Sequence, residues 1–207
     1  MVKTIVNKYF GGFKMNAVII YAHPNPASFN ASIAKIVQEE LEKKGATVKV
    51  KDLYAMKFNP LLSAEDFAGF HNGNTPADIA QEQKDIIAAD IIVFAAPIWW
   101  SSVPAILRGY MDRIFSLGFA YEYTKTGPRG LLTDKKGLFI TTSGADAKSA
   151  EASGMQSVIT HSLVNSFLGF CGFAEYKGKN LCAVTTVNDE ERKDMLTEIR
   201  QLITQFA

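Results

Sequence analysis

Four short runs of almost continuous apolar or β-branched residues recur along the chain, at residues 16–22, 91–96, 138–142 and 181–186. Strands that are covered on both faces have this composition, which is typical of a parallel sheet. A fifth run, residues 47–51 (TVKVK), alternates Val with Lys and therefore predicts a strand at the edge of the sheet. A chain with these five strands has to cover both faces of its sheet.

The segments between the strands have the spacing of amphipathic helices. Helices are predicted over residues 28–44, 78–88, 104–115, 155–168 and 189–206. Strands that alternate with helices predict an α/β fold, and one alternating edge strand favours the flavodoxin-like order, a five-stranded parallel sheet in the order 2-1-3-4-5 with helices on both faces. In that order ligands bind between the first and third strands. The loops expected to meet there are residues 23–30, 97–103 and 143–154.

The composition is that of an ordinary globular protein with one domain. The 207 residues are 47% hydrophobic, and a net charge of +1 gives no basic surface for a nucleic acid. The longest apolar tract is broken by charge and proline, so no insertion into a membrane is expected. The two cysteines, Cys171 and Cys182, lie in apolar sequence and are expected to be buried, reduced thiols of a cytoplasmic protein.

The first fourteen residues, MVKTIVNKYFGGFK, stand before a methionine that directly precedes the first strand. We expect the flavodoxin-like domain to span residues 15–207. Residues 1–14 are expected to be an extension that is either not native or assigned from the wrong start. The intact mass of the naturally expressed protein tests this hypothesis.

The loop after the first strand reads HPNPASFN and contains neither Lys nor Gly. An anion at this loop has to be held by neutral donors: the free N–H groups of the helix that follows, the Ser28 hydroxyl, the Asn30 amide and the His23 ring. Each charge-assisted hydrogen bond contributes about 1.5–3 kcal/mol, so several of them can hold a phosphate monoester. The alternative is that Ser28 only caps the helix while the two prolines shape the turn.

The other two loops add an aromatic and a polar surface. Trp99 and Trp100 directly follow a buried strand, and at least one of them is expected to face the loop cavity and to stack on a planar ring. Their alternative role is packing against the next helix. The loop TTSGADAKSAEASG is small and polar, and it either binds the polar edge of a ring or serves as a connection. Together the three loops favour a flavin mononucleotide moiety.

No other catalytic or metal-binding pattern competes with this interpretation. The chain contains no G-x-S-x-G, no H-E-x-x-H and no evident Cys–His pair. His71 is expected on a surface loop, and His161 lies within a predicted helix, where a structural role is the more common one. The loop 59–76 is long enough to be functional or to lie at a subunit contact.

Several stretches resemble the NAD(P)H:quinone oxidoreductase (DT-diaphorase-like) family. They are AHPNPASFN, DLYAMKFNPLLSAEDF, PIWWSSVPAILRGYMDRIF, FAYEY, KKGLFITTSG and FCGF, and they extend from about Val18 almost to the last residue. The resemblance implies a flavodoxin-like fold, a tightly bound flavin and a homodimer with its active sites at the interface. It also implies transfer of electron pairs from NADH or NADPH to quinones or similar flat acceptors in a ping-pong cycle.

The resemblance also implies roles for single residues. A first-loop group would hold the phosphate side of the flavin: His23, Ser28, Phe29 and Asn30. A second-loop group would line the isoalloxazine ring: Pro97, Ile98, Trp99 and Trp100. A third-loop group would meet the polar edge of that ring: Thr141, Thr142, Ser143 and Gly144. Tyr121 and Tyr123 of FAYEY resemble tyrosines that reach into the pocket of the partner subunit.

Two departures from the animal members limit the resemblance. Residues 145–156 contain neither the Tyr nor the His that those enzymes have in this loop, so another group has to stabilise the reduced flavin. The chain also lacks their C-terminal extension and is similar to shorter bacterial relatives, which favours FMN over FAD. Three alternatives remain: a flavin-binding ancillary subunit of a potassium efflux transporter, an azo- or nitro-reductase, and a flavodoxin-type one-electron carrier, which the near-neutral charge disfavours.

Overall fold

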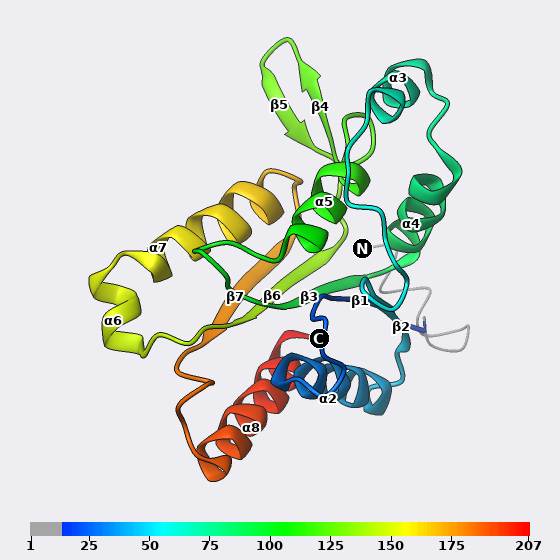
Figure 1. Ribbon diagram of the computed structural model, residues 1–207. Helices are drawn as coiled ribbons and strands as arrows, with labels where there is room; N and C mark the ends of the chain where they lie inside the picture. Colours follow the sequence, from blue (N-terminus) through cyan, green and yellow to red (C-terminus); the bar gives the residue numbers. More distant parts are fainter. Residues whose placement is uncertain (1–13) are drawn as a thin grey trace.

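The computed structural model of the protein describes residues 14–207, so the expected extension lies outside the described residues except for Lys14. A parallel sheet of five strands forms the centre of the molecule, in the order β2-β1-β3-β6-β7 (Figure 1). The strands are β1 (Asn16–Tyr21), β2 (Thr47–Asp52), β3 (Ile91–Pro97), β6 (Lys136–Thr142) and β7 (Glu175–Leu181). Counted within this sheet, the order is the predicted 2-1-3-4-5, so the flavodoxin-like fold is confirmed.

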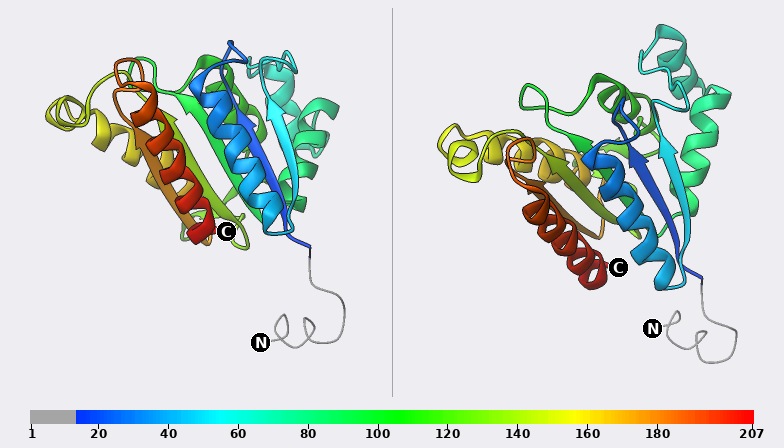
Figure 2. Two further views of the ribbon diagram at one scale, coloured as in Figure 1. Left: turned by 90° about the horizontal axis from the view of Figure 1, so that it is seen from below. Right: turned by 60° about the horizontal axis from the view of Figure 1, so that its bottom comes forward.

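Helices cover both faces of the sheet. On one face α2 (Phe29–Lys43) lies beside α8 (Asp189–Phe206), as Figure 2 shows in blue and red. The other face carries α4 (Ala77–Ala88), α5 (Ala105–Ile114), α7 (Met155–Ile159) and the π-helix η1 (Thr160–Gly169). Neighbouring residues of a strand enter different cores: Ile19 packs with the α2–α8 layer, and Ile20 packs with the opposite layer. Strands buried on both faces explain the continuous apolar runs.

The predicted position of the fifth strand, residues 181–186, is wrong. The strand is β7, which ends at Leu181, where the apolar run begins. β7 is an edge strand with the sequence EYKGKNL and is exposed over much of its length, so it has no continuous apolar signal. Residues 182–186 instead lie in a loop at the carboxyl edge of the sheet, where Ala183 adopts a left-handed φ of 59°.

Three further elements differ from the predictions. The segment 59–76 is not a plain loop, because it contains α3 (Ala64–Asn72), on which His71 lies. A hairpin of β4 (Tyr121–Thr124) and β5 (Gly127–Gly130) follows α5 and stands apart from the main sheet (Figure 1). The short helix α6 (Ala147–Ala152) precedes α7, and the helix predicted over 155–168 continues from α7 as the π-helix η1.

The buried side chain of Arg113, on α5, holds the segment that contains α3 against α5. The Arg113 guanidinium donates two hydrogen bonds to the Asp66 carboxylate, at 2.9 and 3.0 Å, and a third to Asp78 at 2.8 Å. It also donates to the Asn59 carbonyl at 3.0 Å. Asp66 and Arg113 are both buried, and Asp66 closes a capping box with Ser63 at the start of α3. This ion pair therefore fixes the segment against the helical layer.

Acid is expected to weaken this ion pair. The Arg113 guanidinium lowers the pKa of Asp66 below its ordinary value near 3.9. A lowered carboxyl pKa contributes stability that is fully present above the unfolded pKa and is lost as pH falls through the folded pKa. Urea unfolding of the wild type and of Asp66→Asn should differ most near pH 6, and the difference should shrink as the pH falls below about 4. A difference that stays constant over this range would contradict the assignment.

The remaining expectations concern cysteines and membranes. Cys171 is buried, and burial raises the pKa of its thiol to about 12. Cys182 is only half-buried and lies 3.3 Å from the Asn180 amide nitrogen, so the expectation that both thiols are buried is wrong for Cys182. Among the helices of residues 14–207, none combines the length and the apolar character needed to cross a bilayer.

Candidate functional site

The first loop is held in shape by its own side chains. The backbone N–H of Asn25 donates to His23 Nδ1 at 3.0 Å, and the N–H of Ala27 donates to Asn25 Oδ1 at 2.9 Å. Ser28 Oγ accepts the N–H of Ala31 at 3.2 Å and is the N-cap of α2. The hydroxyl of Tyr21, whose pKa burial raises, lies 3.1 Å from the same oxygen. The capping role of Ser28 is therefore confirmed.

The N-terminus of α2 has the features of an anion site. Its first-turn N–H groups at Phe29 and Asn30 have no acceptor within the described part of the chain. The first turn holds no acidic residue, whereas α3 and α8 hold two and three. Because the helix dipole favours negative charge at this end, a carboxylate would compete with a bound anion. Neutral donors surround this end of α2 instead.

Asn30 carries the strongest sign of a missing ligand. The residue is 4% exposed, and its Nδ2 donates to Thr142 Oγ1 at 2.9 Å, although the two residues are 112 positions apart. Its Oδ1 is buried and has no hydrogen-bond partner among the described residues. Leaving a buried polar atom unpaired costs about 1–3 kcal/mol, and native proteins contain few of them. This contact joins the first loop to the end of β6.

The second loop forms a tight turn without glycine. The backbone groups of Trp99 and Ser102 exchange two hydrogen bonds, at 2.8 and 3.0 Å. Between them Trp100 and Ser101 both adopt left-handed φ angles, 52° and 57°. Such conformations cost of order 1–3 kcal/mol each and cluster at functional sites. Trp99 meets the His23 ring edge-on at 5.9 Å, whereas Trp100 is fully exposed and contributes nothing to the core.

The third loop lies beside the second and beside a loop that the sequence analysis missed. The N–H of Ile98 donates to the Thr142 carbonyl at 2.7 Å, and the N–H of Val184 donates to the Ser143 carbonyl at 3.1 Å. A Cβ atom on Gly144 would lie 3.4 Å from Thr185 Oγ1. The missed loop, residues 182–188, contains most of the run 181–186 that was assigned to the fifth strand.

Asn180, at the end of β7, organises the third-loop group from the side. Thr141 Oγ1 donates to Asn180 Oδ1 at 3.0 Å, and Asn180 Nδ2 donates to Ser143 Oγ at 3.1 Å. Thr141 and Ser143 therefore face β7, whereas Thr142 between them faces Asn30. No sequence signal marked Asn180, because its partners become neighbours only through strand pairing of β6 with β7.

Tyr121 and Tyr123 are not brought to these loops within one chain. They lie on the hairpin that follows α5, whereas the second loop precedes α5, and a helix of this length spans about 15 Å. Gly130 of the hairpin lies so close to the turn after η1 that a Cβ would be 2.3 Å from the Gly172 nitrogen. This approach places the Tyr121 ring 5.0 Å from the Phe170 ring.

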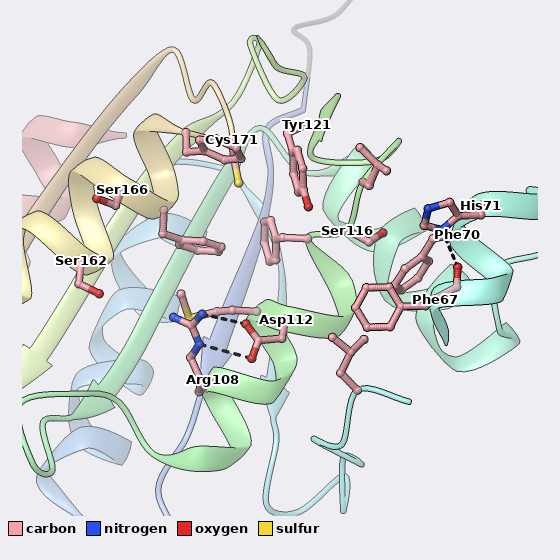
Figure 3. A pocket seen from close by; sticks show the side chains of 16 residues that line it. Phe67, Phe70, His71, Arg108, Asp112, Ser116, Tyr121, Ser162, Ser166 and Cys171 are labelled. Carbon is pink, nitrogen blue, oxygen red and sulfur yellow. Dashed lines mark hydrogen bonds and ion pairs between the residues drawn. The ribbon is translucent and has the colours of Figure 1, made fainter. Parts of the chain in front are cut away.

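Tyr121 lines an apolar groove between α3, α5 and η1, which Figure 3 shows from close by. The groove has a volume of about 490 Å³. Its aromatic lining consists of Phe67, Phe70, Phe115, Tyr121, Phe167 and Phe170. An exposed Arg108–Asp112 ion pair lies at its side, with Nη2 and Oδ1 3.0 Å apart. Phe67 and Phe170 are exposed at the surface of the groove, whereas Phe115 is buried.

The sheet order, with its topological switch point between β1 and β3, defines an α/β protein with a flavodoxin-like fold. A family model described as a flavodoxin-like fold matches residues 15–203, so the chain belongs to that family. Among residues 14–207, no three His, Cys, Asp or Glu side chains are grouped so that they could hold a metal ion.

Relatives whose names state a function are similar to this chain over most of its length. A protein of Haemophilus influenzae named as an uncharacterized NAD(P)H oxidoreductase is 37% identical, over 88% of this chain and 91% of its own. Ribosyldihydronicotinamide dehydrogenase [quinone] of Pongo abelii is 36% identical, over 86% of both chains. The structure of an NAD(P)H:quinone oxidoreductase from Methanothermobacter marburgensis has a TM-score of 0.84 and 28% identity, over 92% of this chain and 98% of its own. The expected resemblance and the expected oxidoreductase class are confirmed.

Proposed function

We propose that this protein is a flavin-dependent NAD(P)H oxidoreductase that reduces quinones or similar flat acceptors by two electrons. The observation that carries the proposal is the unpaired Asn30 Oδ1 beside the free N–H groups at the start of α2. A buried polar atom without a partner fits a site built for a ligand. The donors that fit a phosphate monoester are the free N–H groups of Phe29 and Asn30, since Oδ1 itself can only accept a hydrogen bond. The names of the relatives supply the substrate class.

The residues present fit a flavin. The first-loop group, with Ser28 and Asn30, would hold the phosphate side, and the second-loop group would line the ring. The third-loop group would meet the polar edge of the ring. The Ser143 hydroxyl oxygen already accepts a hydrogen bond from Asn180 Nδ2, so its proton is free to be donated to the flavin. FMN, rather than FAD, is the flavin of this proposal.

When bound, the flavin supplies the two-electron chemistry: it accepts electrons from NADH or NADPH and passes them to the acceptor. The chain contributes positioning and an aromatic platform. Trp100 is held in a strained left-handed conformation with its whole side chain exposed. An exposed indole offers a stacking surface to a flat acceptor, with about 0.5–1.5 kcal/mol beyond burial.

NAD(P)H oxidation in the presence of menadione tests this function. The FMN-loaded protein is expected to consume one NADH or NADPH per menadione. Double-reciprocal plots of the initial rates are expected to give parallel lines, the pattern of a ping-pong mechanism. An azo dye in a parallel assay separates the azoreductase alternative. A flavin-loaded protein that oxidises neither nucleotide with any of these acceptors would contradict the proposal.

The active form is proposed to be a homodimer in which the apolar groove faces a second copy of the chain. Tyr121 and Tyr123 lie a helix length from the loops of their own chain, and Tyr123 is 70% exposed. Phe67 and Phe170, at the rim of the groove, are 53% and 39% exposed. A second copy that covers this surface would place the tyrosines at the loops of the other chain. A cytoplasmic location belongs to the same proposal, since Cys171 and Cys182 are both free.

Phe67→Asp is expected to convert the dimer into monomers, because burying an unpaired carboxylate at an apolar interface is strongly unfavourable. Ile87→Asp is the matched control, because Ile87 is also an exposed apolar residue on a helix but lies outside the groove. Sedimentation of both variants and of the wild type at micromolar concentration checks this. A monomeric wild type, or equal dissociation of both variants, would contradict the assigned interface.

A further inference from the structure

The contact between Asn30 and Thr142 leaves the oxygen end of the amide, which suits no anion, as the unpaired end. Asn30 Nδ2 donates one of its two protons to Thr142 Oγ1 at 2.9 Å. The other end, Oδ1, is the unpaired atom. An unpaired carbonyl oxygen repels a phosphate oxygen, because both atoms carry lone pairs and neither carries a proton. In this arrangement Asn30 can accept a hydroxyl proton but has no direct bond to offer a phosphate through Oδ1.

Thr142 permits a second arrangement. A hydroxyl both donates and accepts, and the Thr142 hydroxyl has no acceptor among the described residues. If the amide turns by about 180° about its terminal bond, which is a broad two-fold torsion, the Thr142 hydroxyl donates to Oδ1. Nδ2 then takes the place of the unpaired oxygen. Every polar atom of the pair is satisfied once an anion accepts from Nδ2.

We propose that Thr142 is a positioning residue that sets the orientation of the Asn30 amide, and that the turned orientation selects a flavin that ends in a phosphate. The Thr142 hydroxyl changes from acceptor to donor as the phosphate binds. This inference rests on the proposed flavin site and adds to it a residue that discriminates FMN from riboflavin. Riboflavin ends in a hydroxyl, which can donate to Oδ1 without any rotation.

Thr141 provides a control of the same residue type in the neighbouring position. Both threonines are buried, at 1% and 2% exposure, but the Thr141 hydroxyl donates to Asn180 and takes no part in the Asn30 contact. Replacing either threonine with valine keeps the shape and removes one hydroxyl. A general loss of packing or stability therefore affects both variants, whereas a loss of phosphate selection affects only Thr142→Val.

The test is the ratio of FMN to riboflavin affinity, measured by fluorescence titration of the flavin-free protein. The wild type is expected to prefer FMN, and Thr142→Val is expected to reduce the preference by about tenfold, the loss of one oriented hydrogen bond. Thr142→Ser should restore it, and Thr141→Val should change both affinities in parallel. Asn30→Asp should abolish the preference for FMN, because its carboxylate can accept from Thr142 but cannot donate to a phosphate. This variant tests the inference if Thr142→Val fails to fold.

The outcomes separate this inference from the proposed function. A wild type that binds neither flavin overturns both. A wild type that binds FMN while Thr142→Val keeps the full preference, or while Thr141→Val loses as much, overturns only the positioning role. An Asn30→Asp variant that still prefers FMN over riboflavin also overturns only the positioning role.

Discussion

Arg113→Leu is expected to lower the free energy of unfolding by about 3–5 kcal/mol, because it leaves the Asp66 carboxylate buried without its partner. Asp66 is 3% exposed and receives two hydrogen bonds from the guanidinium. Arg113→Lys keeps the charge but loses the planar fork, so an intermediate loss is expected. Urea unfolding at neutral pH measures both effects.

Arg108→Leu is the matched control, because Arg108 lies on the same helix and pairs with Asp112 at an exposed site. Exposed pairs contribute about 0–1 kcal/mol, so this variant should unfold almost as the wild type does. Equal losses in the Arg113 and Arg108 variants would show that burial of the Asp66 pair does not govern the stability of the α3 segment.

The double variant Ser28→Ala plus Asn30→Ala is expected to weaken FMN binding by about a hundredfold or more. Two charge-assisted hydrogen bonds are removed, each worth about 1.5–3 kcal/mol, and 1.4 kcal/mol corresponds to a factor of ten. Because Ser28 also caps α2, a loss of about 1 kcal/mol in stability accompanies the change. The flavin retained after gel filtration and the dissociation constant for FMN are the measurements.

Ser63→Ala controls for the lost cap. Ser63 caps α3 by accepting the N–H of Asp66 at 3.1 Å, so its replacement removes a serine cap without touching the three loops. The stability loss should be similar and the FMN affinity unchanged. Equal flavin content in the wild type and the double variant would count against the phosphate assignment.

The central sheet could be predicted because burial on both faces leaves a signal in the sequence. β1, β3 and β6 are continuous apolar runs, and their pairing brings the three predicted loops to one edge. The edge strand β7 could not be found in this way, because one side of it meets solvent and its sequence is mostly polar. The apolar run after it was mistaken for a strand, although it packs against the third loop.

The individual contacts of the site depend on pairings that local patterns do not encode. Ser28 as a helix cap is visible from the sequence, because capping involves residues three positions apart. Asn30 and Thr142 meet across 112 residues, and Asn180 reaches Thr141 only through the register of β6 with β7. The left-handed turn at Trp100 and Ser101 contains no glycine and so carried no turn signal.

A visible absorption spectrum of the purified protein, with mass identification of any released chromophore, tests the flavin site most directly. A yellow protein that releases FMN on denaturation, or a colourless one that binds added FMN at micromolar concentration, is the expected result. A colourless protein that fails to bind either FMN or FAD at that concentration would contradict the account.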